Sequence, residues 1–203
     1  MTLARWLVSA QEAPSVALRD WDLGRHALLR TGTAFDAVRM PEGLVHAAVG
    51  GGQPREVADA LTLALLGPVI CDPGACYYAL VPRATAQTWR SPLAVVRSTG
   101  CWLTVPRTDR NELSGIHWSV PPRTVGQLCA PADVDRLLRI GEAHRARAES
   151  TAALMNHGKN CAACSVGPPL CAEFMRLFQR VEQDARRHVA GLAKSADSNP
   201  TWS

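Results

Sequence analysis

Between residues 69 and 120, short apolar runs alternate with turn sequences, and this alternation most limits the folds open to the chain. Two of the runs, 69–71 and 76–81, flank Asp-Pro-Gly-Ala, a tetrapeptide typical of tight turns. Apolar runs of strand length bounded by turn residues predict a small antiparallel sheet. The other predicted strands of this region are 93–96, 101–105 and 116–120.

The segment before these strands predicts further helices and a hairpin. Residues 3–20 have a helical pattern of apolar residues that is interrupted near Pro14. The runs 26–30 and 35–39 are separated by Thr-Gly-Thr, which predicts a hairpin. Helices are expected at 41–49 and 54–66, because each begins with a proline that suits a first helical turn. These two helices should cover one face of the sheet.

After Pro131 the pattern becomes helical, with a last helix over about 169–192. The predicted fold class is therefore α+β: a small antiparallel sheet with two inserted helices, followed by a helical C-terminal extension. The predicted domains are 1–130 for the α+β part, 131–194 for the extension, and 195–203 for a flexible tail.

The composition fits a packed globular protein, with 203 residues of which 47% are hydrophobic and 20% charged. No apolar run approaches the ~20 residues of a membrane span. The chain starts without the basic-then-apolar pattern of a secretion signal, so a cytoplasmic location is expected.

The net charge of +4 is mild, and no basic run exceeds two residues. This excludes the compact basic stripe of strong nucleic-acid binders. The candidate nucleic-acid surface is an arginine face of the last helix, where binding would be weak and salt-sensitive; the alternative is a solvated face without a ligand. Its residues are Arg176, Arg180, Arg186 and Arg187, with Arg136, Arg139, Arg145 and Arg147 as additions.

Three of the seven cysteines lie within eleven residues near the C-terminus, close to a histidine. Cys161 and Cys164 form a Cys-x2-Cys turn, and with His157 and Cys171 they make a Cys3His set, which suits a structural zinc ion. Unligated thiols, an iron–sulfur centre and a thiol redox switch remain alternatives. Cys71 and Cys76 flank the Asp-Pro-Gly-Ala turn and are expected to be buried thiols.

Several motifs resemble a known family. They are Leu29-Arg-Thr-Gly-Thr-Ala-Phe-Asp-Ala-Val-Arg-Met-Pro41, Gly67-Pro-Val-Ile-Cys-Asp-Pro73, Tyr77-Tyr-Ala-Leu-Val-Pro82, Ser98-Thr-Gly-Cys-Trp-Leu-Thr-Val-Pro106 and Gly115-Ile-His-Trp-Ser-Val-Pro-Pro122. Together they resemble small actinobacterial proteins grouped as bifunctional DNA primase/polymerase-like, within the prim-pol class. The resemblance spans about residues 15–140. It implies a prim-pol-like α+β domain and a role connected with DNA or nucleotides.

Active prim-pol enzymes hold divalent metals with an acidic pair one residue apart on a strand, a third acid and a histidine. The one Asp-x-Asp here, Asp133-Val-Asp135, opens a helix, where acids suit the helix dipole. Asp36 and Asp72 are lone acids, and His117 on a strand is expected to be hydrogen-bonded. No residue is therefore carried over as catalytic.

These observations predict a non-catalytic prim-pol-like protein that binds nucleic acid, a nucleotide or a protein partner. One alternative is an active DNA primase/polymerase-type nucleotidyltransferase in which Asp36 and Asp72 converge. Another is a thiol- or zinc-based sensor. Trp102 and Trp118 alternate into strands and are expected in the core.

Overall fold

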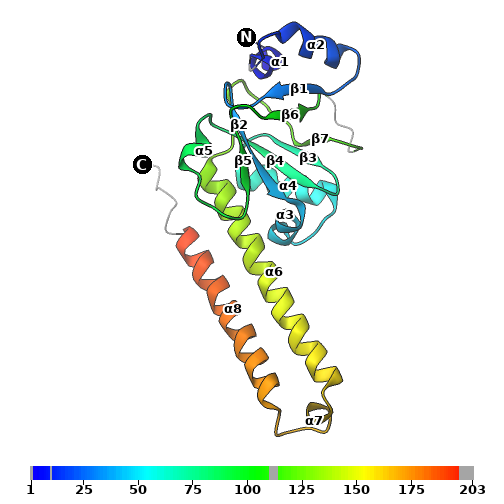
Figure 1. The fold of residues 1–203 in the computed structure, drawn as a ribbon, viewed down its shortest axis with the longest axis vertical. Helices are drawn as coiled ribbons and strands as arrows, with labels where there is room; N and C mark the ends of the chain where they lie inside the picture. The colour runs from blue at the N-terminus through cyan, green and yellow to red at the C-terminus, as the bar shows by residue number, and fades with distance from the viewer. Residues whose placement is uncertain (1, 10, 110–113, 197–203) are drawn as a thin grey trace. The chain divides into compact units, whose positions relative to one another are not determined.

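A computed structural model describes residues 2–9, 11–109 and 114–196 of the chain (Figure 1). Close contacts divide the chain into two compact units, an N-terminal unit of Met1–Leu138 and a C-terminal unit of Arg139–Ser203. The first contains antiparallel sheets with inserted helices, and the second is helical. The predicted α+β class is therefore confirmed.

The N-terminal unit is built on a five-stranded antiparallel sheet with strand order β5-β2-β4-β3-β7. The Asp-Pro-Gly-Ala turn joins β3 to β4 as predicted, and the Ala75 N–H donates to the Asp72 carbonyl at 3.1 Å. The strands are β2 (Asp36–Pro41), β3 (Val69–Asp72), β4 (Cys76–Val81), β5 (Val95–Arg97) and β7 (His117–Val120).

One face of this sheet is covered by α3 (Glu42–Val49) and α4 (Pro54–Leu65), as the sequence predicted. Val57, Leu61 and Leu65 of α4 recur every four residues, so they share one side of the helix and are at most 1% exposed. The start of the long helix α6 (Pro131–Asn160) joins the same core cluster through Val134, Leu137 and Leu138.

A second layer covers the other face. It contains the two-stranded sheet of β1 (Ala27–Arg30) and β6 (Trp102–Val105), with α1 (Leu3–Val8) and α2 (Pro14–Asp22). The short helix α5 (Thr85–Thr88) follows β4. The break between α1 and α2 agrees with the interruption expected near Pro14.

The predicted hairpin of 26–30 with 35–39 is wrong. β1 pairs with β6, while β2 pairs with β4 and β5, so the two segments belong to different sheets. The intervening turn is bonded elsewhere, because the Thr31 N–H donates to Cys101 O at 3.1 Å and its hydroxyl to Ser98 O at 2.6 Å. These bonds direct the chain from one sheet into the other.

The core prediction for the tryptophans is right for one of them. Trp118 is 5% exposed and its indole N–H donates to Pro106 O at 3.1 Å. Trp102 is 56% exposed, because its side chain lies on the outer face of β6, where the Arg30 guanidinium covers its ring at 5.5 Å from the centroid.

The C-terminal unit contains the rest of α6, the short α7 (Ala162–Ser165) and α8 (Ala172–Ala196), which runs back in the direction opposite to α6 (Figure 1). The last helix thus begins three residues later than the predicted 169. Of the predicted flexible tail 195–203, the first two residues end α8 and 197–203 lie outside the described residues. Among the helices that the structure describes, none combines the length and apolar character needed to cross a membrane.

Candidate metal centre

The Cys3His residues lie where α6, α7 and α8 join. His157 is in the last turn of α6, Cys161 follows the helix, and Cys164 lies in α7. Cys171 immediately precedes Ala172, the first residue of α8. All four side chains are half-buried. Three helix ends therefore converge on one small group of soft ligands.

Local hydrogen bonds explain how the Cys-x2-Cys turn forms. The Cys161 N–H donates to His157 O at 2.9 Å, which continues the α6 pattern by one residue. The Cys164 N–H then donates to Cys161 O at 3.0 Å, which closes a tight turn. The chain reverses toward α8 at Gly167, whose φ of +103° is a conformation that glycine adopts without strain.

Cys171 caps the N-terminus of α8 with its sulfur. The Phe174 N–H donates to the Cys171 Sγ at 3.4 Å, the bond that an N-cap side chain makes to the third helical residue. This bond favours the thiolate and, with the neighbouring groups, lowers the pKa of Cys171 to about 6. The sequence placed Cys171 in the first helical turn, and the structure places it one residue earlier, at the cap.

The ligand atoms have the separations of a tetrahedral site. The Cys171 Sγ lies 3.0 Å from His157 Nε2, 3.5 Å from Cys164 Sγ and 3.9 Å from Cys161 Sγ. The Cys164 Sγ lies 3.7 Å from His157 Nε2, and all four atoms are within 4.8 Å of one another. Zinc bonds of about 2.3 Å to sulfur and 2.0–2.1 Å to nitrogen give tetrahedral edges of about 3.5–3.8 Å. The four residues could therefore hold one metal ion.

Within the described residues, this is the one group of three or more His, Cys, Asp or Glu side chains with such convergence. Sequence reasoning identified all four members, but it missed the neighbours that support them. The ring of Phe174 lies 6.3 Å from the ring of His157, centroid to centroid, and close to Gly158. The spacing of 16 residues between Gly158 and Phe174 carries no signal of this contact.

The predicted arginine face is exposed, but several of its charges are paired within α8. Arg176 lies 2.9 Å from Glu173, Arg186 lies 3.8 Å from Glu182, and Arg187 lies 3.9 Å from Asp184. These side chains are 74–81% exposed. Such pairs reduce the positive potential that a phosphate backbone would meet.

The two lone acids of the N-terminal unit do not come together. Asp36 pairs with Val81 at one end of β4, whereas Asp72 pairs with Cys76 at the other end. Five residues of strand separate these positions by about 16 Å. Asp36 is also fully buried and accepts hydrogen bonds from the Ser98 hydroxyl at 2.9 Å and the Ala86 N–H at 3.3 Å.

The other candidate residues have structural surroundings. Asp133 lies in the first turn of α6 and forms an ion pair with Arg136, as expected of a capping acid. His117 is 6% exposed and its Nδ1 lies 2.8 Å from Gly115 O.

Cys71 and Cys76 are buried free thiols, as predicted. In the β3–β4 register Cys71 lies opposite Tyr77 and Cys76 opposite Asp72. Because neighbouring residues of a strand point to opposite faces, the two thiols lie on different faces of the sheet.

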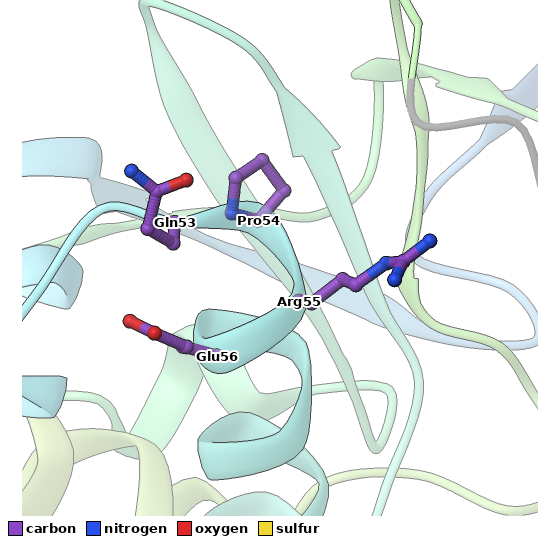
Figure 2. A pocket seen from close by; sticks show the side chains of 4 residues that line it. All are labelled: Gln53, Pro54, Arg55 and Glu56. Carbon is purple, nitrogen blue, oxygen red and sulfur yellow. The ribbon is translucent and has the colours of Figure 1, made fainter.

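A surface hollow at the start of α4 is lined by four consecutive exposed residues, Gln53, Pro54, Arg55 and Glu56. Figure 2 shows the Arg55 side chain directed away from those of Gln53 and Glu56. Since its polar groups do not converge, the hollow offers no ligand site comparable with the Cys3His group.

No family model matches the chain, and no curated protein or solved structure matches it either.

Proposed function

We propose that this chain is a non-catalytic, prim-pol-like binding protein whose C-terminal hairpin of α6 and α8 is fixed by one structural zinc ion. The observation that carries the proposal is the convergence of one histidine nitrogen and three cysteine sulfurs within 4.8 Å. Zinc is the metal that most often takes such a tetrahedral set of sulfur and nitrogen ligands.

The segment that joins the helices supports a structural role for the ion. Residues 162–170 contain two prolines, a glycine and several small residues, and Val166 is 88% exposed. A turn with so little buried apolar surface gains little free energy to offset the cost of ordering its backbone. A metal ion bonded to His157, Cys161, Cys164 and Cys171 supplies that free energy locally.

The donor set also favours structure over catalysis. A catalytic zinc keeps one position open for water or substrate, whereas four protein ligands fill a tetrahedral ion completely. The non-catalytic proposal for the N-terminal unit has separate support, because Asp36 and Asp72 are paired with opposite ends of β4. Two-metal nucleotidyl transfer needs acids that share ions about 4 Å apart.

Metal analysis of the chain purified without added zinc tests the proposal. We expect about one zinc per chain, and loss of that zinc in Cys164→Ser. The matched control is Cys101→Ser, because Cys101 is a half-exposed thiol of the N-terminal unit, outside the cluster, and its replacement should leave the zinc content unchanged. Zinc near zero in the unaltered chain, or equal zinc in both variants, would refute the structural zinc.

A primer-synthesis assay with Mg²⁺ or Mn²⁺ tests the non-catalytic part. The expected result is no template-dependent product. Product formation that disappears in Asp36→Ala would show instead that the chain is an active nucleotidyltransferase.

A further inference from the structure

One side of the α6–α8 hairpin leaves large apolar side chains open to solvent. Met155, Met175 and Phe178 are 57%, 46% and 44% exposed, although folded proteins usually bury such side chains. Exposed alanines of α6 and a glutamate of α8 continue the same side. We name this surface the alanine–methionine face: Ala148, Ala152 and Met155 of α6, with Met175, Phe178 and Glu182 of α8.

Helical spacing places the members from each helix in one row. In α6 the spacings are four and three residues, and in α8 they are three and four, so each row covers two turns on one side of its helix. The two rows also share a side of the hairpin. In antiparallel right-handed helices, the residue that follows an inward-facing one turns toward the same side of the pair.

The inward-facing residues are known from their contacts. Phe174 faces α6, because its ring lies near His157 and beside Gly158. Leu154 is half-buried one turn before Gly158. Met175 follows Phe174 and Met155 follows Leu154, so both methionines turn to the same side of the hairpin.

The face is complementary to a second copy of itself. Its large side chains lie at the metal end of the hairpin, and the small Ala148 and Ala152 lie further along α6. If two copies pack in opposite directions about a two-fold axis, the large side chains of each meet the alanines of the other, as large and small residues alternate in packed helices.

The charges of the face agree with this occupant. Its acid, Glu182, lies 3.8 Å from Arg186 of its own helix, so the surface has no net sign that would select a phosphate chain or an acidic partner. Two helices also cover only part of each other's apolar surface, whereas four helices enclose a core.

The geometry points to a homodimer in which the alanine–methionine faces of two chains pack antiparallel about a two-fold axis and form a four-helix bundle. This inference rests on the proposed zinc-fixed hairpin, since the ion holds the adjoining ends of α6 and α8 in the arrangement that exposes the face. The zinc is not part of the interface, so the two ideas can fail separately.

Sedimentation equilibrium of the zinc-loaded full chain over a wide concentration series tests the dimer. We expect a species of twice 21.9 kDa that dissociates on dilution. Phe178→Glu should weaken the dimer by about thirtyfold or more, the effect of placing a charge at a central interface residue. Arg180→Glu, on the other side of α8, is the matched control and should dimerise normally.

A second pair of variants tests the packing without altering the hairpin interior. Ala148→Trp should abolish the dimer by filling the space for the partner's large side chains, whereas Ala153→Trp should not, because exposed Ala153 precedes Leu154 and lies on the other side of α6. Helical circular dichroism checks that each variant is folded. Normal dimerisation of both Phe178→Glu and Ala148→Trp would refute the proposed face.

Zinc is measured in every sample to separate the two proposals. A zinc-bound chain that stays monomeric at all concentrations refutes the dimer and leaves the metal site intact. A zinc-free chain that dimerises through this face supports the dimer and refutes the structural zinc.

Discussion

Cysteine plays opposite parts in the two units of this chain. In the N-terminal unit Cys71, Cys76 and Cys129 are at most 5% exposed and behave as small apolar side chains. In the C-terminal unit the cluster sulfurs are half-buried, and the Cys164 and Cys171 sulfurs lie 3.5 Å apart. The same atom therefore fills space where a sheet supplies the core, and serves as a ligand where little core exists.

The surroundings of the two kinds of thiol shift their pKa values in opposite directions. Burial raises the pKa of Cys129 to about 12, because no solvent stabilises its thiolate. The Phe174 N–H helps to lower the pKa of Cys171 to about 6. A metal needs a thiolate, so only the second environment is prepared for one.

Removal of zinc by a strong chelator should have the largest effect, and only on the C-terminal unit. Structural zinc in small domains contributes about 10 kcal/mol or more of apparent binding free energy at neutral pH. We expect limited proteolysis to cut within 139–187 after chelation while 1–138 resists, since the N-terminal unit has its own core on both faces of the sheet. An unchanged cleavage pattern in a chain shown to be zinc-free would contradict this.

Alkylation of the metal-free chain should show the second largest contrast. Cys171 should react increasingly as the pH rises through about 6 and then level off. Cys129 should stay unmodified near neutral pH, where a thiol of pKa about 12 is thiolate in only about 10⁻⁵ of molecules. Peptide mapping by mass spectrometry identifies the modified residue, and equal rates for the two would refute the contrast.

The same pKa has a consequence for stability without metal. Because the folded-state pKa of Cys171 lies below the reference value of 9.0, its capping thiolate stabilises α8 fully above that value. This stabilisation is lost as the pH falls through about 6. Helical circular dichroism of the metal-free chain against pH measures it.

The sequence predicted what depends on local pattern. The Asp-Pro-Gly-Ala turn, the helices from 41 to 66 and the Cys3His spacing each involve neighbours within about fifteen residues, and the structure contains all of them. It could not predict pairings set by the whole fold. The segment 26–30 pairs with 102–105 because bonds from Thr31 to Ser98 and Cys101 divert the chain, and nothing near Thr31 indicates those partners.

Trp102 shows the same limit on a single side chain. Alternation along a strand says which residues share a face, but not which face is covered. Leu103 and Val105 of β6 point inward, and Trp102 and Thr104 therefore point outward.

Substituting a glycine of the N-terminal unit should have the third largest effect. Gly67 is buried, and a Cβ there would lie 2.6 Å from the carbonyl carbon of Leu128 and clash with the Cys129 backbone. The Cys129 N–H now donates to Leu80 O at 2.7 Å, a bond that the shift would disturb. We expect Gly67→Ala to reduce the free energy of unfolding by about 2–4 kcal/mol.

Denaturant unfolding measures that loss, and the zinc content should not change, because the metal ligands belong to the other unit. Gly67→Ala with unaltered stability would mean that the approach of these two backbones is looser than the structure has it.

The smallest effect is expected for the corresponding change beside the metal, and its sign is opposite. Gly158 lies in α6 with no backbone conformation that requires glycine, and a Cβ there would meet only Phe174 Cε2 at 3.7 Å, an ordinary contact. Alanine restricts the unfolded chain more and suits a helix better, so Gly158→Ala should raise stability by about 0.5–1 kcal/mol. Thermal unfolding followed by circular dichroism, with zinc bound, measures the gain. A loss of stability or of zinc would show that the hairpin tolerates no added methyl group beside His157, and that the C-terminal unit is packed as tightly as the N-terminal core.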